Sequence, residues 1–130
     1  MKVRYLYIYC DDIVILGKSK EELHQLRYEI QQYLQDNLKL DLKDNYQIFP
    51  VDTRGIDFVG YRHFRNYILL RKTTSKNMIR KMRKLINKVE SEGELTYSEW
   101  CSINSYKGWM KWANCYNLYK KWIEPLEPLS

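Results

Sequence analysis

Two adjacent aspartates, Asp11 and Asp12, stand between two short apolar runs near the start of the chain. The runs Val3–Tyr9 and Ile13–Leu16 are rich in β-branched and aromatic residues and have the length of strands. Two such runs joined by a few polar residues are typical of a β-hairpin. The sequence therefore predicts that Tyr9-Cys10-Asp11-Asp12 forms the tip of a hairpin, with both carboxylates at or beside the turn.

Paired carboxylates on a rigid hairpin can hold a divalent cation. Mg²⁺ takes one or two protein carboxylates and completes its octahedron with waters and substrate phosphates. Phosphoryl transfer uses such ions to orient and neutralise the reacting oxygens. A structural explanation is also open, because aspartate is common in turns for backbone reasons alone. The pair by itself does not decide between the two.

The charge balance favours an anionic partner. The chain has 130 residues, 22 of them Lys or Arg and 16 Asp or Glu, for a net charge of +6. Such a field attracts nucleic acid or an acidic membrane surface. No apolar run approaches the roughly 18 residues needed to cross a bilayer, and no signal peptide is expected before the first strand. Three cysteines without CxxC spacing and two histidines disfavour zinc and favour a reduced, cytoplasmic compartment.

The segment after the hairpin predicts one helix and then short strands. Ser19 and Glu22 have capping-box spacing, and apolar residues then recur at helical period, which predicts a helix lying across the sheet. Its stripe consists of Leu23, Leu26, Ile30, Tyr33, Leu34 and Leu38. Three strands are expected next, joined by turns at 52–55 and 65–66. They are Gln47–Val51, Ile56–His63 and Tyr67–Leu70, the first being an edge strand or ending at Pro50.

From Thr73 onward the pattern predicts helices. Residues 71–90 carry eight Lys or Arg against one acid, so the composition change near Arg71 is the best lobe boundary. The first helix has an apolar side of Met78, Ile79, Met82, Leu85, Ile86 and Val89, and an opposite basic face of Arg80, Lys81, Arg83, Lys84 and Lys88. Gly93 is expected to end it, and Thr96 with Glu99 to begin the next. A last helical segment is expected around Leu118–Ile123, ended by Pro125 and Pro128.

These residues, in this order, resemble the reverse transcriptases of prokaryotic retroelements. Tyr9-Cys10-Asp11-Asp12 is similar to the YxDD box of that family, and the segment 55–61, Gly-Ile-Asp-Phe-Val-Gly-Tyr, is similar to its primer-grip hairpin. The basic helix and the aromatic-rich helices after it resemble the three-helix thumb. The resemblance covers essentially the whole chain. It does not separate diversity-generating retroelements, group II introns and retrons.

The resemblance implies a role for each matching residue. Asp11 would be the main metal ligand of the box and Asp12 its weaker partner, with Mg²⁺ as the cofactor and Mn²⁺ as an alternative. Tyr9 and Cys10 would lie against the primer end and the newly paired base. The primer strand would be held by Phe58, Gly60 and Tyr61. Alternatively, Gly60 marks a β-bulge, and Phe58 and Tyr61 are core residues. This alternative stays open.

The departures from the family pattern are equally informative. The family uses a further metal-binding aspartate on a strand that precedes the hairpin, together with fingers and a nucleotide pocket, and this sequence contains no counterpart of them. A lysine that the family places after the helix has no clean equivalent. Lys43 is nearest, but Tyr46 stands closer to the aligned position, so no role is assigned. Residues 1–71 are therefore expected to be the C-terminal part of a palm, and residues 72–130 a helical thumb.

Structural explanations compete with several of these assignments. The basic face is a solvated surface in most helices with such a run, although the charge imbalance also favours phosphate contacts. The tryptophans and tyrosines near the C-terminus have the spacing of a packed bundle, which favours core over base stacking. Cys10 is expected to be a small buried residue and not a nucleophile, because no histidine stands near it in sequence.

Together these observations predict an α+β chain that forms part of an RNA-directed DNA polymerase, a nucleotidyltransferase with a two-metal mechanism. Its partners would be an RNA template, a DNA primer and deoxynucleotides, with no membrane partner. Residues 1–130 alone are expected not to synthesise DNA. Two alternatives are a non-catalytic nucleic-acid-binding module and a decayed remnant that retains the fold. The open edge of Val3–Tyr9 also predicts self-association, unless the following helix covers the sheet.

Overall fold

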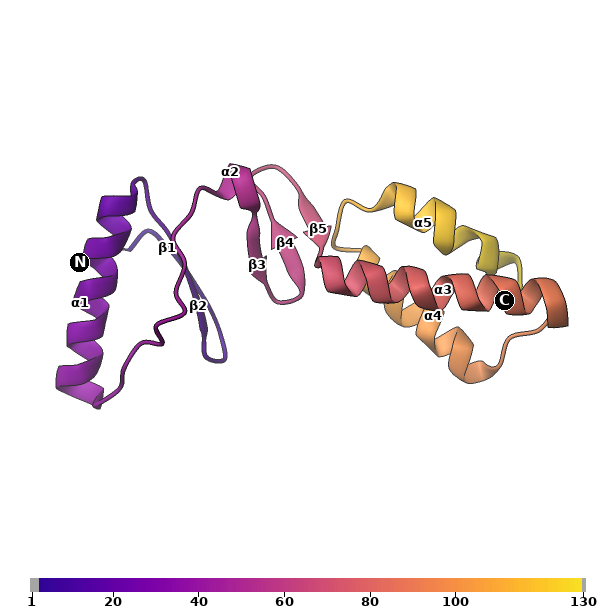
Figure 1. The fold of residues 1–130 in the computed structure, drawn as a ribbon, viewed down its shortest axis with the longest axis horizontal. Helices are drawn as coiled ribbons and strands as arrows, with labels where there is room; N and C mark the ends of the chain where they lie inside the picture. Colours follow the sequence, from indigo (N-terminus) through magenta and orange to yellow (C-terminus); the bar gives the residue numbers. More distant parts are fainter. Residues whose placement is uncertain (1–2, 130) are drawn as a thin grey trace. The chain divides into compact units, whose positions relative to one another are not determined.

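The computed structural model describes residues 3–129, and they divide between Arg54 and Gly55 into two units. The first, here the hairpin unit, contains β1 (Tyr5–Tyr9), β2 (Asp12–Leu16), α1 (Lys20–Leu38) and the short α2 (Val51–Arg54). The second, the helical unit, contains β3 (Ile56–Phe58), β4 (Tyr61–His63), β5 (Ile68–Leu70), α3 (Lys72–Glu92), α4 (Tyr97–Met110), α5 (Tyr116–Trp122) and the 3₁₀ helix η1 (Glu124–Leu129) (Figure 1). The predicted α+β class is confirmed.

The predicted hairpin is present at the start of the chain. Strands β1 and β2 are antiparallel, and Tyr9 pairs with Asp12 across a two-residue turn of Cys10 and Asp11. Cys10 has a φ of 53°, a left-handed conformation that costs a residue with a Cβ roughly 1–2 kcal/mol. Two-residue hairpin turns need a positive φ at their first central residue to match the twist of the strands. The turn therefore imposes this conformation on the residue that precedes the aspartates.

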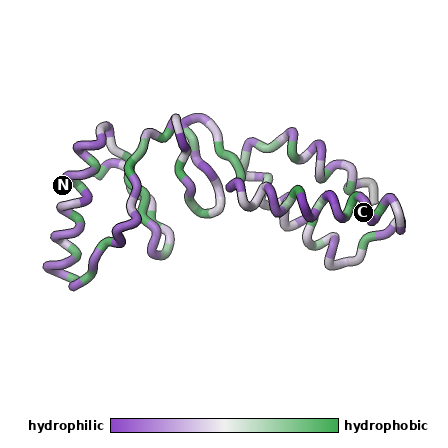
Figure 2. Tube along the Cα trace, viewed as in Figure 1, coloured by the Kyte–Doolittle hydropathy of each residue, from purple (hydrophilic) through white to green (hydrophobic). Residues whose placement is uncertain are grey.

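Helix α1 begins as predicted, because the Ser19 side chain accepts a hydrogen bond from the Glu22 amide at 3.1 Å. The expectation that the helix covers the hairpin is met only in part, since most of the apolar stripe of α1 and the second half of β2 are half-buried. None of the residues of α1 is buried, and every residue of β1 is between 48% and 61% exposed. The physical reason lies in the composition of α1, which is mostly hydrophilic with isolated apolar positions (Figure 2). Its stripe is too narrow to bury both itself and a sheet.

The exposed hairpin is expected to cause self-association. Within the described residues β1 pairs with β2 alone, so its other edge is open, and open apolar edges pair with further chains. Sedimentation across a concentration series should show oligomers for the natural chain and a monomer for Tyr5→Lys/Tyr7→Lys. The matched control, Tyr28→Lys/Tyr33→Lys, changes two exposed tyrosines of α1 and should still associate. A natural chain that stays monomeric at high micromolar concentration would contradict the prediction.

Two of the strand predictions are wrong. Gln47–Val51 is not a strand, because the carbonyl of Pro50 accepts hydrogen bonds from the Thr53 amide at 3.3 Å and from its hydroxyl at 2.8 Å. Those bonds begin the short helix α2 instead. The segment 56–63 is not one strand but the hairpin β3–β4, with a turn at Val59 and Gly60. Both turn residues have positive φ, 50° and 84°, the backbone of a type I′ turn.

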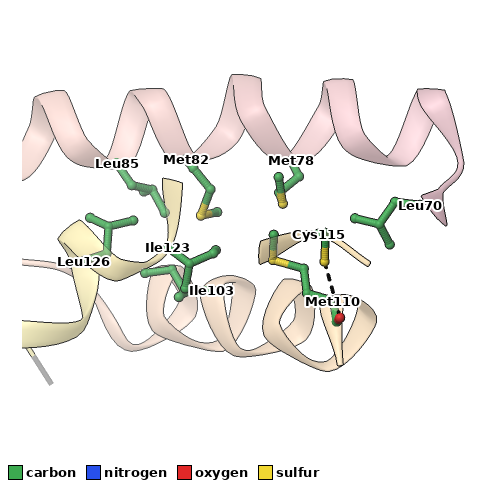
Figure 3. Packing of buried hydrophobic residues seen from close by; sticks show 9 residues of the cluster. All are labelled: Leu70, Met78, Met82, Leu85, Ile103, Met110, Cys115, Ile123 and Leu126. Carbon is green, nitrogen blue, oxygen red and sulfur yellow. Dashed lines mark hydrogen bonds between the residues drawn. The ribbon is translucent and has the colours of Figure 1, made fainter. Parts of the chain in front are cut away.

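The buried core lies entirely in the helical unit. Its nine residues come from β5, the helices and the segments that join them, and they converge between α3, α4 and α5 (Figure 3). They are Leu70, Met78, Met82, Leu85, Ile103, Met110, Cys115, Ile123 and Leu126. The apolar side predicted for α3 is confirmed, since Met78, Met82 and Leu85 are buried and the other three members pack against the core. Helix α5 ends at Trp122, and η1 continues through both prolines.

The ends of the helices match their sequence signals. Gly93 ends α3 with a φ of 77° and an amide bonded to the Val89 carbonyl. Thr96 and Glu99 form a complete capping box at the start of α4. The same Glu99 carboxylate accepts two hydrogen bonds from the Lys88 ammonium, at 2.9 and 3.0 Å. The hydrogen bonds from Lys88 are the largest cause of a lowered pKa at Glu99, and the hydrogen bond from the Thr96 backbone amide is the next largest. Together they lower the pKa of Glu99 from 4.5 to about 2.

Acid is therefore expected to lower the free energy of unfolding of the helical unit, because protonation of Glu99 removes its hydrogen bonds with Lys88 and Thr96. A carboxyl group with a lowered folded-state pKa stabilises the fold above its unfolded pKa, and that stabilisation disappears as pH falls through the folded one. The window runs from pH 4.5 down to about 2. Urea unfolding at several pH values should show a flatter acid limb for Glu99→Gln than for the natural chain. Glu94→Gln, at an exposed position, is the control, and equal acid limbs for both variants would refute the assignment.

Candidate nucleic-acid interface

The hairpin tip presents two adjacent carboxylates. Asp12 is the first residue of β2 and Asp11 lies in the turn, and both are exposed. Cys10 is exposed as well, so the expectation that it is a buried residue is wrong, because it occupies a hairpin turn whose residues are exposed. The Lys43 ammonium lies 3.1 Å from Oδ2 of Asp11. The hydrogen bond from Lys43, followed by one from the Asp11 backbone, lowers the pKa of Asp11 below its ordinary value. This carboxylate is therefore ionised at neutral pH and already attracts one cation.

The donor set of the tip suits a hard divalent cation. Mg²⁺ is commonly held by one or two carboxylates, with water and phosphate oxygens as the remaining ligands, and Asp11 and Asp12 provide such a pair. No group of three or more Asp, Glu, His or Cys side chains with metal-binding geometry occurs among residues 3–129. A cation at this tip would thus take its remaining ligands from solvent, from a substrate or from further protein groups.

The residues matched to the primer grip lie in the helical unit. Phe58 and Tyr61 are half-buried and flank the β3–β4 turn. The Tyr61 hydroxyl donates a hydrogen bond of 2.8 Å to the Trp109 carbonyl oxygen, and burial raises its pKa. The Trp109 ring lies over Gly60, where a Cβ would come within 2.4 Å of it. Gly60 therefore marks a turn and a close contact with α4, not the β-bulge considered from sequence.

The five cations predicted as one basic face have different surroundings. Lys88 is paired with Glu99, and the Lys81 ammonium donates to the Ser102 hydroxyl at 2.7 Å. The Arg83 guanidinium lies 5.3 Å from the centre of the Trp122 ring. Arg80 and Lys84 are exposed, and Arg80 donates to Asn77 of its own helix. Three of the five thus join α3 to α4 or α5, which leaves Arg80 and Lys84 as the clearest candidates for phosphate contacts.

Sequence reasoning missed two features of these surfaces. The Lys43–Asp11 ion pair joins positions 32 residues apart, and no local pattern predicts it. The aromatic residues near the C-terminus were expected to be core, whereas Trp112 and Tyr116 are 67% and 69% exposed. A signal for the second feature exists in the sequence, because residues 100–123 contain four lysines and no acid. Such a stretch is unusual for the inside of a bundle.

No model of a known protein family matches the chain, and no curated protein matches it. Within the part of the chain that the structure describes, no helix combines the length and the apolar character that crossing a membrane requires.

Proposed function

We propose that this chain is the part of an RNA-directed DNA polymerase that carries the acidic hairpin of the palm and the helical thumb. The observation that carries the proposal is the two-residue turn that places Asp11 and Asp12 side by side at the tip of β1–β2. The order of hairpin, helix, second hairpin and three-helix bundle accords with the resemblance in sequence.

The residues of the tip suit the chemistry of nucleotidyl transfer. Bound Mg²⁺ would neutralise charge on the triphosphate and orient the attacking hydroxyl. Asp11 would hold such an ion, because its exposed carboxylate lies in the turn at the tip of the hairpin and is ionised at neutral pH like any aspartate. The Lys43 ammonium, 3.1 Å from Oδ2 of Asp11, is a cation beside this carboxylate and would compete with the ion for it. Asp12, fixed by pairing with Tyr9, would provide the second carboxylate.

Primer extension by the complete product of the gene tests this proposal. With primed RNA, deoxynucleotides and Mg²⁺, we expect extension that Asp11→Asn lowers by about a hundred- to a thousandfold, the size of effect seen when one electrostatic group is removed from an active site. Asp36→Asn, an exposed position of α1, should leave extension unchanged. Residues 1–130 alone should give no extension. A complete product that extends no primer, or an Asp11→Asn variant as active as the natural protein, would refute the polymerase function.

Binding to a primer–template duplex should depend on the exposed cations of α3. We expect a Kd on the order of 10⁻⁴ to 10⁻⁶ M, with a salt slope that falls by about 0.7 to 0.9 for each phosphate contact removed. Arg80→Glu/Lys84→Glu should weaken binding and flatten the slope in anisotropy titrations at two salt concentrations. Lys18→Glu/Lys20→Glu carries the same charge change in the hairpin unit. If both pairs weaken binding equally, only net charge matters and the basic face is a solvated surface.

A further inference from the structure

The turn between α4 and α5 exposes two large aromatic rings beside buried neighbours. Trp112 is 67% and Tyr116 is 69% exposed, whereas Met110 and Cys115 on the same turn are 5% and 9% exposed. Tryptophan is among the more buried residues of folded proteins on average. Scattered exposed apolar side chains need no explanation. Here, however, two large exposed rings lie on one short segment whose other apolar residues lie in the core or pack against it, and this arrangement needs an explanation.

The backbone that carries these rings is fixed in place. The Asn114 amide donates to the Ile68 carbonyl at 2.7 Å, and its side-chain oxygen accepts from the Ile68 amide at 3.0 Å. The turn is thereby joined to strand β5. On its inner side the Cys115 thiol donates to the Met110 carbonyl at 3.3 Å within the core (Figure 3). Rings on a fixed backbone bind a ligand without a large loss of conformational entropy.

Each ring is accompanied by a lysine. The Lys111 ammonium lies 5.3 Å from the centre of the Trp112 ring, and the Lys120 ammonium lies 5.6 Å from the centre of the Tyr116 ring. Residues 100–123 contain four lysines and no acid. Lys107 is paired with Glu127 at 2.7 Å. The charges of Lys111, Lys120 and Lys121 make the surface favour an anion. A ligand that combines flat apolar faces with a regular negative charge is complementary to this arrangement. Unpaired nucleotides have both properties, because bases stack on aromatic rings while phosphates contact cations.

We propose that the turn from Lys111 to Tyr116 is a stacking platform for unpaired bases of single-stranded nucleic acid. Bases within a duplex are occupied by their own stacking and pairing, so the platform would select single-stranded segments. The proposal rests on the helical unit alone. It requires neither a metal at Asp11 nor polymerase activity, and it would hold equally for a chain that only binds nucleic acid.

Comparison of a normal strand with a strand lacking bases tests the platform. The probes are a labelled deoxythymidine oligonucleotide about ten nucleotides long and an abasic deoxyribose-phosphate oligomer of equal length and charge. In anisotropy titrations we expect the normal strand to bind more tightly. Trp112→Ala should raise its Kd by roughly five- to a hundredfold, the range for loss of one base–aromatic stack. The same variant should leave binding of the abasic strand unchanged.

Two further variants make the result specific. Trp112→Phe should retain most of the affinity, because a smaller ring still stacks. Tyr97→Ala removes an aromatic residue that is 85% exposed at the opposite end of α4 and should have no effect. The titrations contain no divalent cation, primer–template duplex or deoxynucleotide, so failure of the polymerase proposal and failure of the platform give different results. Equal affinity for the two probes, or an unchanged Kd for Trp112→Ala, would overturn the platform.

Discussion

Substituting Gly60 with alanine is expected to lower the free energy of unfolding of the helical unit by about 2–5 kcal/mol. About 1–2 kcal/mol comes from the left-handed backbone, at φ 84°, which disfavours any residue with a Cβ. A further 1–3 kcal/mol comes from overpacking, because the new Cβ would lie 2.4 and 2.6 Å from two atoms of the Trp109 ring. Urea unfolding followed by far-ultraviolet circular dichroism measures the loss.

Two other glycines separate the backbone effect from the steric one. Gly93 has a φ of 77° but open space around its Cβ position, and Gly108 lies in helix α4 with open space as well. Gly93→Ala should therefore cost about 1–2 kcal/mol, and Gly108→Ala should stabilise by roughly 0.5–1 kcal/mol. If Gly60→Ala costs no more than Gly93→Ala, the Trp109 ring moves away freely, and the close contact between turn and helix contributes nothing to stability.

Truncating Ile103 to alanine is expected to cost the helical unit about 2–5 kcal/mol, the range for removing a large aliphatic side chain from a core. Ile103 is fully buried and lies on α4 in the same cluster as residues of α3, Leu126 of η1 and Ile123, which directly follows α5 (Figure 3). The core cluster has nine buried residues, so few neighbouring side chains can move to fill the cavity that the substitution leaves. The denaturation midpoint should fall markedly, with a slope that stays the same.

Asn104→Ala is the matched control, because the neighbouring position on the same helix is exposed. Its effect should stay within about 0.5 kcal/mol. A cost below 1 kcal/mol for Ile103→Ala would mean that the bundle repacks around the missing side chain. Ile103→Val, which removes a single methylene, should then show almost no effect, whereas a rigid core predicts about 0.5–1.5 kcal/mol.

Local signals predicted most of the elements. The Ser19 and Thr96 caps, the Gly93 helix end and the apolar side of α3 depend on residues three or four positions apart, and the structure has all of them. The local pattern did not predict the β3–β4 turn, because Val59 and Gly60 stand in an apolar run that is typical of a strand. Only the resemblance to the primer-grip hairpin implied a turn in this segment. Positive φ is uncommon for valine. The Trp109 ring that packs on this turn comes from 49 residues further along the chain than Gly60 (109 − 60), so it leaves no local trace.

The candidate site divides in the same way. The place of Asp11 and Asp12 in the hairpin followed from the flanking runs, because register in a two-residue hairpin is fixed by the turn. The surroundings of the charged residues did not follow. Lys88 belonged to a basic face by its position on the helical wheel, yet it bonds to Glu99 of the next helix. Periodicity places a side chain on one side of its own helix and gives no information about which charge a neighbouring helix presents.

The separation of the core from the hairpin has a spectroscopic consequence. All four tryptophans, Trp100, Trp109, Trp112 and Trp122, belong to the helical unit, whereas β1 contributes only tyrosines. Tryptophan emission therefore reports directly on the helical unit, and no tryptophan lies within the hairpin unit. A substitution at Asp11 could open β1–β2 completely while the emission spectrum stayed native. Integrity of the hairpin has to be followed through the exchange of its own backbone amides, because six of the 12 tyrosines also belong to the helical unit.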